Sequence, residues 1–303
     1  AILQYTRTVY YVENEEIVCL SNEHTRFCNI DGEPIEKQPV TIDWDIHAAE
    51  KGGYEHFMLK EIHEQPKAVR DTISPRIHEN EIDLGEIGMT DEEIKNLRKI
   101  SIVACGSAYH TGAVGKYVIE ELARIPVETD LASEFRYRNP IYQENSLVII
   151  VSQSGETADS LAALRDAKAH GCKVLSIVNV VGSSIARESD AVLYTWAGPE
   201  ISVATTKAYS CQLAVFYLLA LKFAQIRSAI TPDTFQTLLT ALKQLPDQIE
   251  GLLSQKEKIQ FFANHYLATE HIFFMGRGID YAISMEGSLK LKEISYIHSE
   301  AYA

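Results

Sequence analysis

The apolar positions of this chain change from a β-type pattern to an α/β pattern. Residues 1–42 carry short strand-like stretches separated by turn residues, and Asp31-Gly32 predicts a hairpin turn among them. Because so few residues cannot form a core of their own, we interpret them as the tail of a larger, β-containing domain. Residues 43–59 have a mixed composition around Gly52-Gly53 and predict a linker.

Helical spacing from Tyr54 to Ile73 predicts a first helix, which Pro66 either kinks or splits. Thr90 to Glu93 has the pattern of a capping box. Beyond it, apolar runs of strand length alternate with stretches of helical spacing, which predicts parallel strands joined by right-handed crossovers. The expected order is strand and turn 99–107, helix 110–125, strand 126–135, strand 146–152, helix 157–171, strands 173–179 and 191–196, and helix 201–229. The predicted fold class is therefore α/β, with a doubly wound parallel sheet flanked by helices.

The last third of the chain predicts a second α/β unit. The helix from Ile201 to Ala229 is long and largely apolar, so we expect it to lie against the sheet or against a partner subunit. Two further helical stretches lead to a strand and turn over His271 to Gly278. A second unit then begins near Phe261 and is cut off at Ala303.

Composition narrows the classes of protein that fit. A length of 303 residues suits about two domains, and 46% hydrophobic with 23% charged residues is ordinary for a soluble globular protein. A net charge of −14 argues against nucleic acid or an anionic membrane as partner. The five scattered cysteines indicate reduced thiols in a cytoplasmic protein, without a disulfide frame or a metal site. We expect no membrane-spanning run, and the start at Ala1 suggests a fragment.

The stretch VIIVSQSGETAD, residues 148–159, is the first candidate site. An apolar strand leads into a turn of hydroxyls, an amide and a glycine, and helical spacing follows. Such a turn directs backbone N–H groups, and the positive end of the helix, toward one point, which suits a phosphate group. The alternative is an N-capped helix after a serine-rich turn. The residues concerned are Ser152, Gln153, Ser154, Gly155 and Thr157.

Two other strand-to-helix turns carry small residues, Cys105-Gly106-Ser107 and Gly276-Arg277-Gly278. In an open parallel sheet, ligands lie beyond the carboxyl ends of the strands, where the strand order reverses. Two such turns in one sheet therefore predict a phosphate or phosphosugar site, and a nucleotide is disfavoured because no P-loop or GxGxxG spacing is present.

Single side chains near these turns allow more than one interpretation. Cys105 is either a nucleophile or, as we favour, a residue that lines the pocket. His110 is interpreted as an ordinary helix-face residue. Lys207 is either a phosphate partner or, as we favour, a snorkelling lysine.

The helix predicted from Tyr281 to His298 carries Glu286, Lys290 and Glu293, which fall within roughly 60° of one another around the helix. A surface ion pair at this spacing would be ordinary. Apolar residues such as Ile283 and Ile294 flank the three charges, however, and serines, Ser288 among them, occupy the opposite face. Charges on an apolar side must be paired, so we predict an acid–base row that acts on a sugar.

Six motifs in order resemble the glutamine–fructose-6-phosphate aminotransferase family, also called the glucosamine-6-phosphate synthase family, whose members carry SIS sugar isomerase domains. SQSGETAD alone would indicate only a SIS fold, whereas the helix EGSLKLKE points to the synthase. The resemblance covers nearly the whole chain. The motifs are ACGSAY, LASEFRYR, SQSGETAD, NVVGSSIARESD, VATTKAY and EGSLKLKEISYIHSEAYA.

The resemblance implies a domain order. Residues 1–42 would end a glutaminase domain whose catalytic cysteine precedes Ala1, residues 60–230 would form a first SIS domain, and residues 245–303 would begin a second. The family's ring-opening histidine and Schiff-base lysine would lie beyond Ala303. A chain limited to these residues is therefore expected to be inactive.

The resemblance also assigns site residues. Glu293 matches the enolisation base, in a row with Lys290 and Glu286. Ala108 stands where the family has a phosphate-binding serine, so one hydroxyl is lost. The substrate-binding positions are Cys105, Gly106, Ser107, Ser152, Gln153, Ser154, Thr157 and Val203.

The implied reaction converts fructose 6-phosphate and glutamine into glucosamine 6-phosphate and glutamate, without a metal or an organic cofactor. The implied protein is a cytoplasmic homodimer that binds neither nucleic acid nor a membrane. Two rivals remain: a SIS deglycase or isomerase that uses no glutamine, and a regulator that binds phosphosugar without chemistry. The β-rich residues 1–42 argue against the first, and the charged row on the helix argues against the second.

Overall fold

The computed structural model describes residues 5–22, 24–41, 50–85 and 87–303. The chain divides into two compact units, Ala1–Gly53 and Tyr54–Ala303. The division falls inside the predicted linker, of which residues 43–49 lie outside the described residues.

The first unit consists of two small antiparallel pairs. Strand β1 (Thr8–Val9) pairs with β4 (Val40–Thr41), and β2 (Glu16–Leu20) pairs with β3 (Thr25–Asn29). The turn at Asp31-Gly32 forms as expected: the Gly32 N–H donates to the Asn29 carbonyl over 3.0 Å, at a φ of +84°. Among the described residues of this unit only Phe27 and Cys28 are buried, which is too little for a core.

Within the described residues, five strands of the second unit form the parallel sheet that the sequence predicts. Their order is β11-β10-β9-β7-β8, so the winding direction reverses between β7 and β9. This reversal puts the carboxyl ends of β7 and β9 side by side. The strands are β7 (Lys99–Ala104), β8 (Val127–Leu131), β9 (Ser146–Ser152), β10 (Lys173–Val178) and β11 (Ala191–Tyr194).

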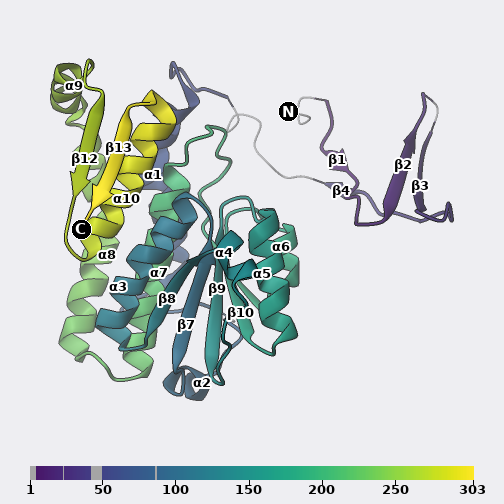
Figure 1. The fold of residues 1–303 in the computed structure, drawn as a ribbon, viewed down its shortest axis with the longest axis horizontal. Coiled ribbons are helices and arrows are strands. Elements are labelled where there is room, and N and C mark those ends of the chain that lie inside the picture. The colour runs from purple at the N-terminus through teal and green to yellow at the C-terminus, as the bar shows by residue number, and fades with distance from the viewer. Residues whose placement is uncertain (1–4, 23, 42–49, 86) are drawn as a thin grey trace. The chain divides into compact units, whose positions relative to one another are not determined.

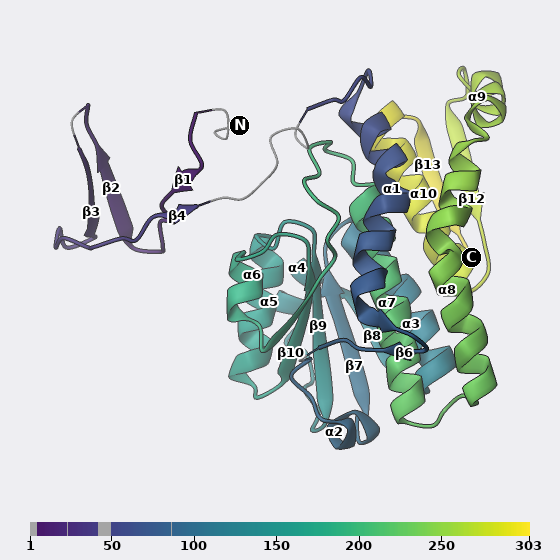
Figure 2. The ribbon, with the colours of Figure 1, turned by 180° about the vertical axis from the view of Figure 1, so that it is seen from behind.

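Both faces of the sheet are covered, which explains its unalternating apolar strands. Ile149 of β9 joins the core toward α3 (Ser107–Ala123) and α7 (Lys207–Ile226), whereas its neighbour Ile150 joins the core toward α5 (Ala158–Ala169). Figure 1 shows α5 and α6 (Ser184–Glu188) on one side and α3 and α7 on the other. In Figure 2, α1 (Phe57–Ile73) lies against α7 and α8 (Pro232–Leu253).

Helix α1 runs through Pro66 without a break, so the predicted split does not occur. Proline has no N–H to donate to the carbonyl of Ile62, four residues earlier. The Gln65 side chain donates to that carbonyl instead, over 3.2 Å. Between α1 and the sheet come the 3-10 turn Ser74–Arg76, the strands β5 (Ile77–His78) and β6 (Glu81–Ile82), and α2 (Asp91–Lys95) with the predicted Thr90 capping box.

Two predicted boundaries in and around the sheet are wrong, and so is one expectation about apolar runs. The expected strand 126–135 stops at Leu131, because the next residues form helix α4 (Ala132–Tyr137). The expected helix 201–229 begins only at Lys207, because residues 200–206 form a loop. Helix α7 also corrects the expectation about membrane-length runs: it is long and apolar enough to span a membrane, but 61% of that window is buried inside the protein.

The chain ends in a small β-α-β unit. Helix α9 (Lys256–His265) precedes β12 (His271–Met275), α10 (Ile279–Ser295) and β13 (His298–Tyr302), and the two strands pair in parallel. The helix predicted to reach His298 therefore stops at Ser295, where Tyr296 takes a φ of +58°. Helix α10, yellow in Figure 1, packs against α3.

Candidate functional site

The turn after β9 is built around Gly155. Its φ is +70°, and a Cβ on it would lie 2.0 Å from the Ser183 hydroxyl, so only glycine fits. The Ser152 hydroxyl accepts the Gly155 N–H over 3.0 Å and lies 3.1 Å from the Thr157 hydroxyl. Thr157 is the N-cap of α5 but makes no side-chain cap. The first N–H groups of α5 therefore face the turn, as an anion site requires.

The turn after β7 leads into α3 in the same way. Gly106 is the N-cap residue, with a φ of +56° and no side-chain cap on the helix. Ser107 is the first helical residue, so its hydroxyl and the first N–H groups of α3 lie at the same end of the sheet as the Ser152 turn.

The two turns line one cleft of about 260 Å³. It contains nine of the eleven predicted site residues, whereas Gly106 and Glu286 are not among its lining residues. The third glycine turn, residues 276–278, is not among them either. The lining residues are Cys105, Ser107, Ala108, Val151, Ser152, Gln153, Ser154, Thr157, Glu200, Ser202, Val203, Thr205, Gln212, Lys290 and Glu293.

The charges of α10 form a graded row from the interior to the cleft. Side-chain exposure is 7% at Glu286, 18% at Lys290 and 37% at Glu293. The Lys290 ammonium lies 3.6 Å from a Glu286 oxygen and pairs closely with Glu293. The expected burial thus holds for Glu286, but Glu293 is partly exposed.

The expected division of α10 into an apolar and a serine-bearing face is wrong. Ile283 and Ile294, expected beside a buried row, are 43% and 51% exposed. Ser288, expected on the far face, is buried because β13 covers it, and its hydroxyl lies 3.0 Å from that of Ser299. A strand that the sequence did not predict therefore changes which side of α10 is covered.

His110 is not an ordinary helix-face residue. Its Nδ1 lies 2.7 Å from a Glu286 carboxylate oxygen, and only 15% of its side chain is exposed. Cys105 is half-buried and lines the cleft as expected, and none of the described residues is a base hydrogen-bonded to it.

The loop before α7 supplies the lining residues that sequence patterns missed. Glu200 accepts the backbone N–H groups of Thr206 over 2.9 Å and of Ala208 over 3.2 Å, and the Thr205 hydroxyl donates to it. Its carboxylate thereby caps the positive end of α7. A capping acid six residues before the N-cap does not match a capping box, so no local signal revealed it.

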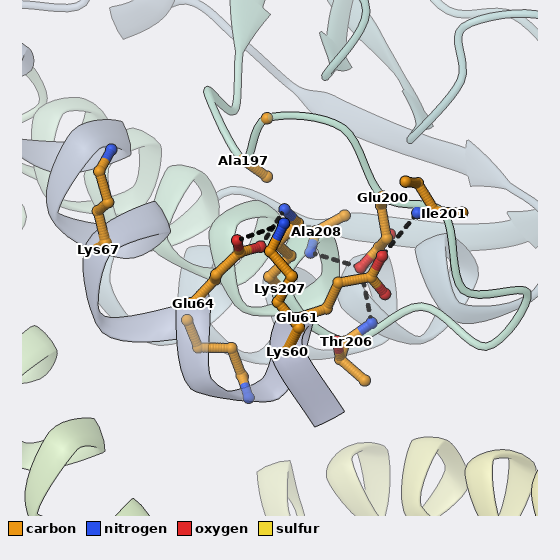
Figure 3. A network of polar contacts seen from close by, with 12 residues as sticks. Lys60, Glu61, Glu64, Lys67, Ala197, Glu200, Ile201, Thr206, Lys207 and Ala208 are labelled. Atoms are coloured by element: carbon orange, nitrogen blue, oxygen red, sulfur yellow. Dashed lines mark hydrogen bonds and ion pairs between the residues drawn. The ribbon is translucent and has the colours of Figure 1, made fainter. Parts of the chain in front are cut away.

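A buried carboxylate from α1 holds the same loop. One Glu61 oxygen accepts the N–H groups of Ile201 over 2.6 Å and of Ser202 over 3.1 Å (Figure 3). The other oxygen has no hydrogen-bond partner in the described part of the chain, and burial raises the pKa of Glu61. Because Ser202 lines the cleft, Glu61 holds in place the backbone of part of the cleft wall.

Lys207 is neither a phosphate partner nor a snorkelling lysine. Its side chain is 5% exposed, and its ammonium donates to Glu64 over 2.8 Å (Figure 3). It does not line the cleft. The buried ion pair explains why this lysine stays inside the protein.

The cleft can bind an anion through hydroxyls and amides. Among the described lining residues Lys290 is the only cation, and it is already shared with carboxylates. Within the parts of the chain that the structure describes, no cluster of three or more His, Cys, Asp or Glu side chains could hold a metal ion. The arrangement therefore offers neutral donors at one end and a lysine–glutamate pair at the other.

The comparisons with known proteins agree with one another. The SIS domain family matches residues 93–222. The glutamine–fructose-6-phosphate aminotransferase of Clostridium acetobutylicum is 57% identical over all of this chain and 50% of its own length. That of Methanosarcina acetivorans is 47% identical over all of this chain and 49% of its own length. The chain thus spans about half the length of these curated relatives.

Two solved structures share the fold. The C-terminal domain of glucosamine-fructose-6-phosphate aminotransferase from Francisella tularensis matches with a TM-score of 0.80 at 42% identity, over 84% of this chain and 71% of that one. A phosphosugar isomerase of Silicibacter pomeroyi, so named provisionally, matches with a TM-score of 0.68 at 26% identity, over 81% of this chain and 71% of that one.

Proposed function

The chain belongs to the glutamine–fructose-6-phosphate aminotransferase family, and from this premise we propose that it forms the sugar-phosphate isomerase part of such an enzyme. The enzyme would convert fructose 6-phosphate and glutamine into glucosamine 6-phosphate and glutamate. The observation that carries the proposal is the cleft itself, in which two glycine turns at the switch point face Lys290 and Glu293. The two SIS rivals, a glutamine-independent isomerase and a regulator, receive no support from a specific observation.

We assign residues 1–42 to the end of a glutaminase domain, 43–59 to a linker, 60–230 to a first SIS domain and 245–303 to the start of a second. The small number of buried residues in the first unit supports the first assignment, because such a piece needs a larger domain around it. The parallel β12-α10-β13 unit supports the last. The linker assignment shortens at its end, because α1 already begins at Phe57.

The phosphate group is assigned to the β9 turn. Ser152, Ser154 and Thr157 offer hydroxyls there, and α5 offers its first N–H groups. A methyl group at Ala108 lines the cleft, so the β7 turn contributes only the Ser107 hydroxyl. The sugar would lie along the remaining lining residues, Cys105, Gln153 and Val203, with Gly106 setting the turn between Cys105 and Ser107.

The chemistry is assigned to the charged row of α10. Ammonia from glutamine would add at C2 of the open sugar, and the C2 oxygen would leave as water, so that an imine forms. Glu293 would take a proton from C1 and return it at C2, while the proton of the C1 hydroxyl moves to the imine nitrogen; this leaves an aldose with an amine at C2. Lys290 and Glu286 would set the charge around this base. The glutamine would be processed in the glutaminase domain.

We further propose a cytoplasmic homodimer that needs no metal or organic cofactor. The burial of α7 in the core supports a protein that does not use this helix to cross a membrane. The net charge of −14 supports the absence of nucleic-acid and membrane partners.

Thermal protection tests the phosphate assignment. Fructose 6-phosphate should raise the melting midpoint of the full-length protein, and fructose at the same concentration should not, because it lacks the phosphate. A ligand at 100 times its dissociation constant stabilises the folded state by about 2.7 kcal/mol, which is readily measured. The variant Ser154→Ala should reduce the shift, whereas Ser254→Ala, in an exposed position at the end of α8, should not. Equal protection by both sugars would refute the assignment.

A further inference from the structure

His110 joins the substrate-binding turn of the first α/β unit to the charged helix of the second. It lies in the first turn of α3, the helix that begins at Ser107. Its Nδ1 lies 2.7 Å from an Oε2 of Glu286 on α10. A carboxylate at this distance accepts a hydrogen bond, so Nδ1 is the donor. The contact therefore crosses the packing surface between α3 and α10.

Glu286 connects His110 to the cleft through Lys290. While Oε2 is held by His110, Oε1 makes no hydrogen bond to any residue that the structure describes, and it lies 3.6 Å from the Lys290 ammonium. Lys290 also pairs with Glu293, which reaches the cleft. Without a donor on Oε2, the buried Glu286 carboxylate would turn toward Lys290, the nearest cation. Lys290 would then move away from Glu293.

We propose that His110 is a positioning residue for the isomerisation step: its Nδ1–H holds Glu286 so that Lys290 remains shared between Glu286 and Glu293. This proposal rests on the proposed function. The same hydrogen bond keeps α10 in register with the Ser107 turn, so that the base and the bound sugar phosphate are aligned across two elements.

The surroundings of the pair separate this role from simple packing. Next to it, Ala113 and Val114 of α3 and Ala282 of α10 form an apolar cluster that already joins the two helices. At such a place an apolar side chain packs as well as a buried ion pair does. If His110 served only packing, an aromatic ring without a donor would leave turnover unchanged.

The test compares two substitutions in the full-length protein. His110→Phe keeps the ring and removes the donor, whereas His110→Asn places an amide N–H close to the position of Nδ1. We expect His110→Phe to lower kcat about 10- to 100-fold, as a misplaced catalytic group does, with little change in the KM for fructose 6-phosphate. His110→Asn should keep kcat within about threefold. A threefold change in rate requires less than half of the change in activation free energy that a tenfold change requires.

The control is His170→Phe, which removes another histidine beside an acid, 3.6 Å from Asp166 on the exposed face of α5. It should leave kcat unchanged. Melting midpoints are measured for all variants; should His110→Phe unfold at assay temperature, His110→Leu takes its place. A kcat near wild type without the donor, an equal loss in His110→Asn, or a loss confined to KM would each overturn the proposal. A wild-type protein that forms no glucosamine 6-phosphate would refute the proposed function itself, and the inference with it.

Discussion

At the scale of single residues, exposure and charge in the α10 row follow the demands of proton transfer. A base must reach the substrate, and Glu293, with 37% of its side chain exposed, is the row's most accessible carboxylate. A charge that tunes the base works best where water does not screen it, and Glu286, at 7%, is the least accessible. The gradient therefore suits the proposed roles, in which Glu293 is the base and Glu286 adjusts the charge around it.

We predict that Glu293→Gln lowers synthase turnover by about 100- to 10,000-fold, the usual contribution of a general base. Glutamine keeps the shape of the side chain but cannot take up a proton at neutral pH. Thermal stability should change little, because a partly exposed ion pair contributes only about 0–1 kcal/mol. Turnover and melting midpoint are measured on the same variant of the full-length protein.

The matched control for Glu293→Gln is Glu300→Gln, which removes an exposed glutamate of β13 that lies 3.6 Å from His298. It should retain turnover. If Glu293→Gln keeps a near-normal rate, or melts at assay temperature before its rate falls, the base is another residue.

At the scale of elements, the loop before α7 depends on acids that come from two directions. Glu200 caps α7 from within the loop, and Glu61 of α1 holds the N–H groups of Ile201 and Ser202. Because Ser202 and Val203 line the cleft, the shape of this wall is set by a carboxylate about 140 positions earlier in the chain. The partner of such a contact cannot be read from a local pattern.

We predict different effects for two replacements of Glu61. Glu61→Leu leaves the Ile201 and Ser202 N–H groups without acceptors, so the free energy of unfolding should fall by about 1–3 kcal/mol. The protection by fructose 6-phosphate should fall with it. Glu61→Gln keeps an acceptor oxygen and should preserve that protection. Denaturant unfolding and melting with and without the sugar phosphate measure both effects.

The pH dependence of stability in Glu61→Gln and wild type shows whether the charge of Glu61 stabilises or destabilises the fold. Burial raises the pKa of Glu61 above its ordinary value of 4.5. The folded state therefore keeps the proton at pH values where the unfolded state has lost it, and stability falls as the pH rises from about 4.5 through the raised pKa. The stability of Glu61→Gln relative to wild type should thus increase over that range. If the difference in stability between Glu61→Gln and wild type is constant with pH, ionisation of Glu61 costs the folded state no free energy.

The elements that the sequence predicted are those whose signal is local. Strand β9 is buried on both faces and has an unbroken apolar run, and α2 has its capping box. Helix α4 was missed because its N-cap, Leu131, makes no side-chain cap. Strand β13 was missed because HSEAY is polar and pairs with β12, far earlier in the sequence.

At the scale of the whole molecule, the site follows from sheet topology more than from any one motif. The sequence predicted the two glycine turns, and the strand order β9-β7 places them together at the switch point. It could not predict that His110 would meet Glu286 across 176 positions, since that contact depends on how α10 packs on α3. The sequence therefore predicted the local motifs of the site, but it could not predict which residues far away in the chain contact them.

The division of the chain leads to a last prediction. Every lining residue of the cleft lies between Cys105 and Glu293, inside the unit Tyr54–Ala303. The hydrophobic clusters also consist of residues from this unit, from Ala68 onward. A protein of residues 54–303 should therefore melt cooperatively, with the same midpoint as residues 1–303, because the described residues of the removed part contribute nothing to these clusters.

The same shortened protein should keep the full shift in melting midpoint with fructose 6-phosphate and should show none with fructose. Ser154→Ala in both lengths serves as the control, since it should reduce the shift equally in each if the phosphate site is complete without residues 1–53. The midpoints are compared across a range of sugar-phosphate concentrations, so that equal dissociation constants can be distinguished from a saturating excess. A weaker shift in residues 54–303, with the midpoint of the free protein unchanged, would mean that the first unit contributes to binding and that the cleft is not the whole site.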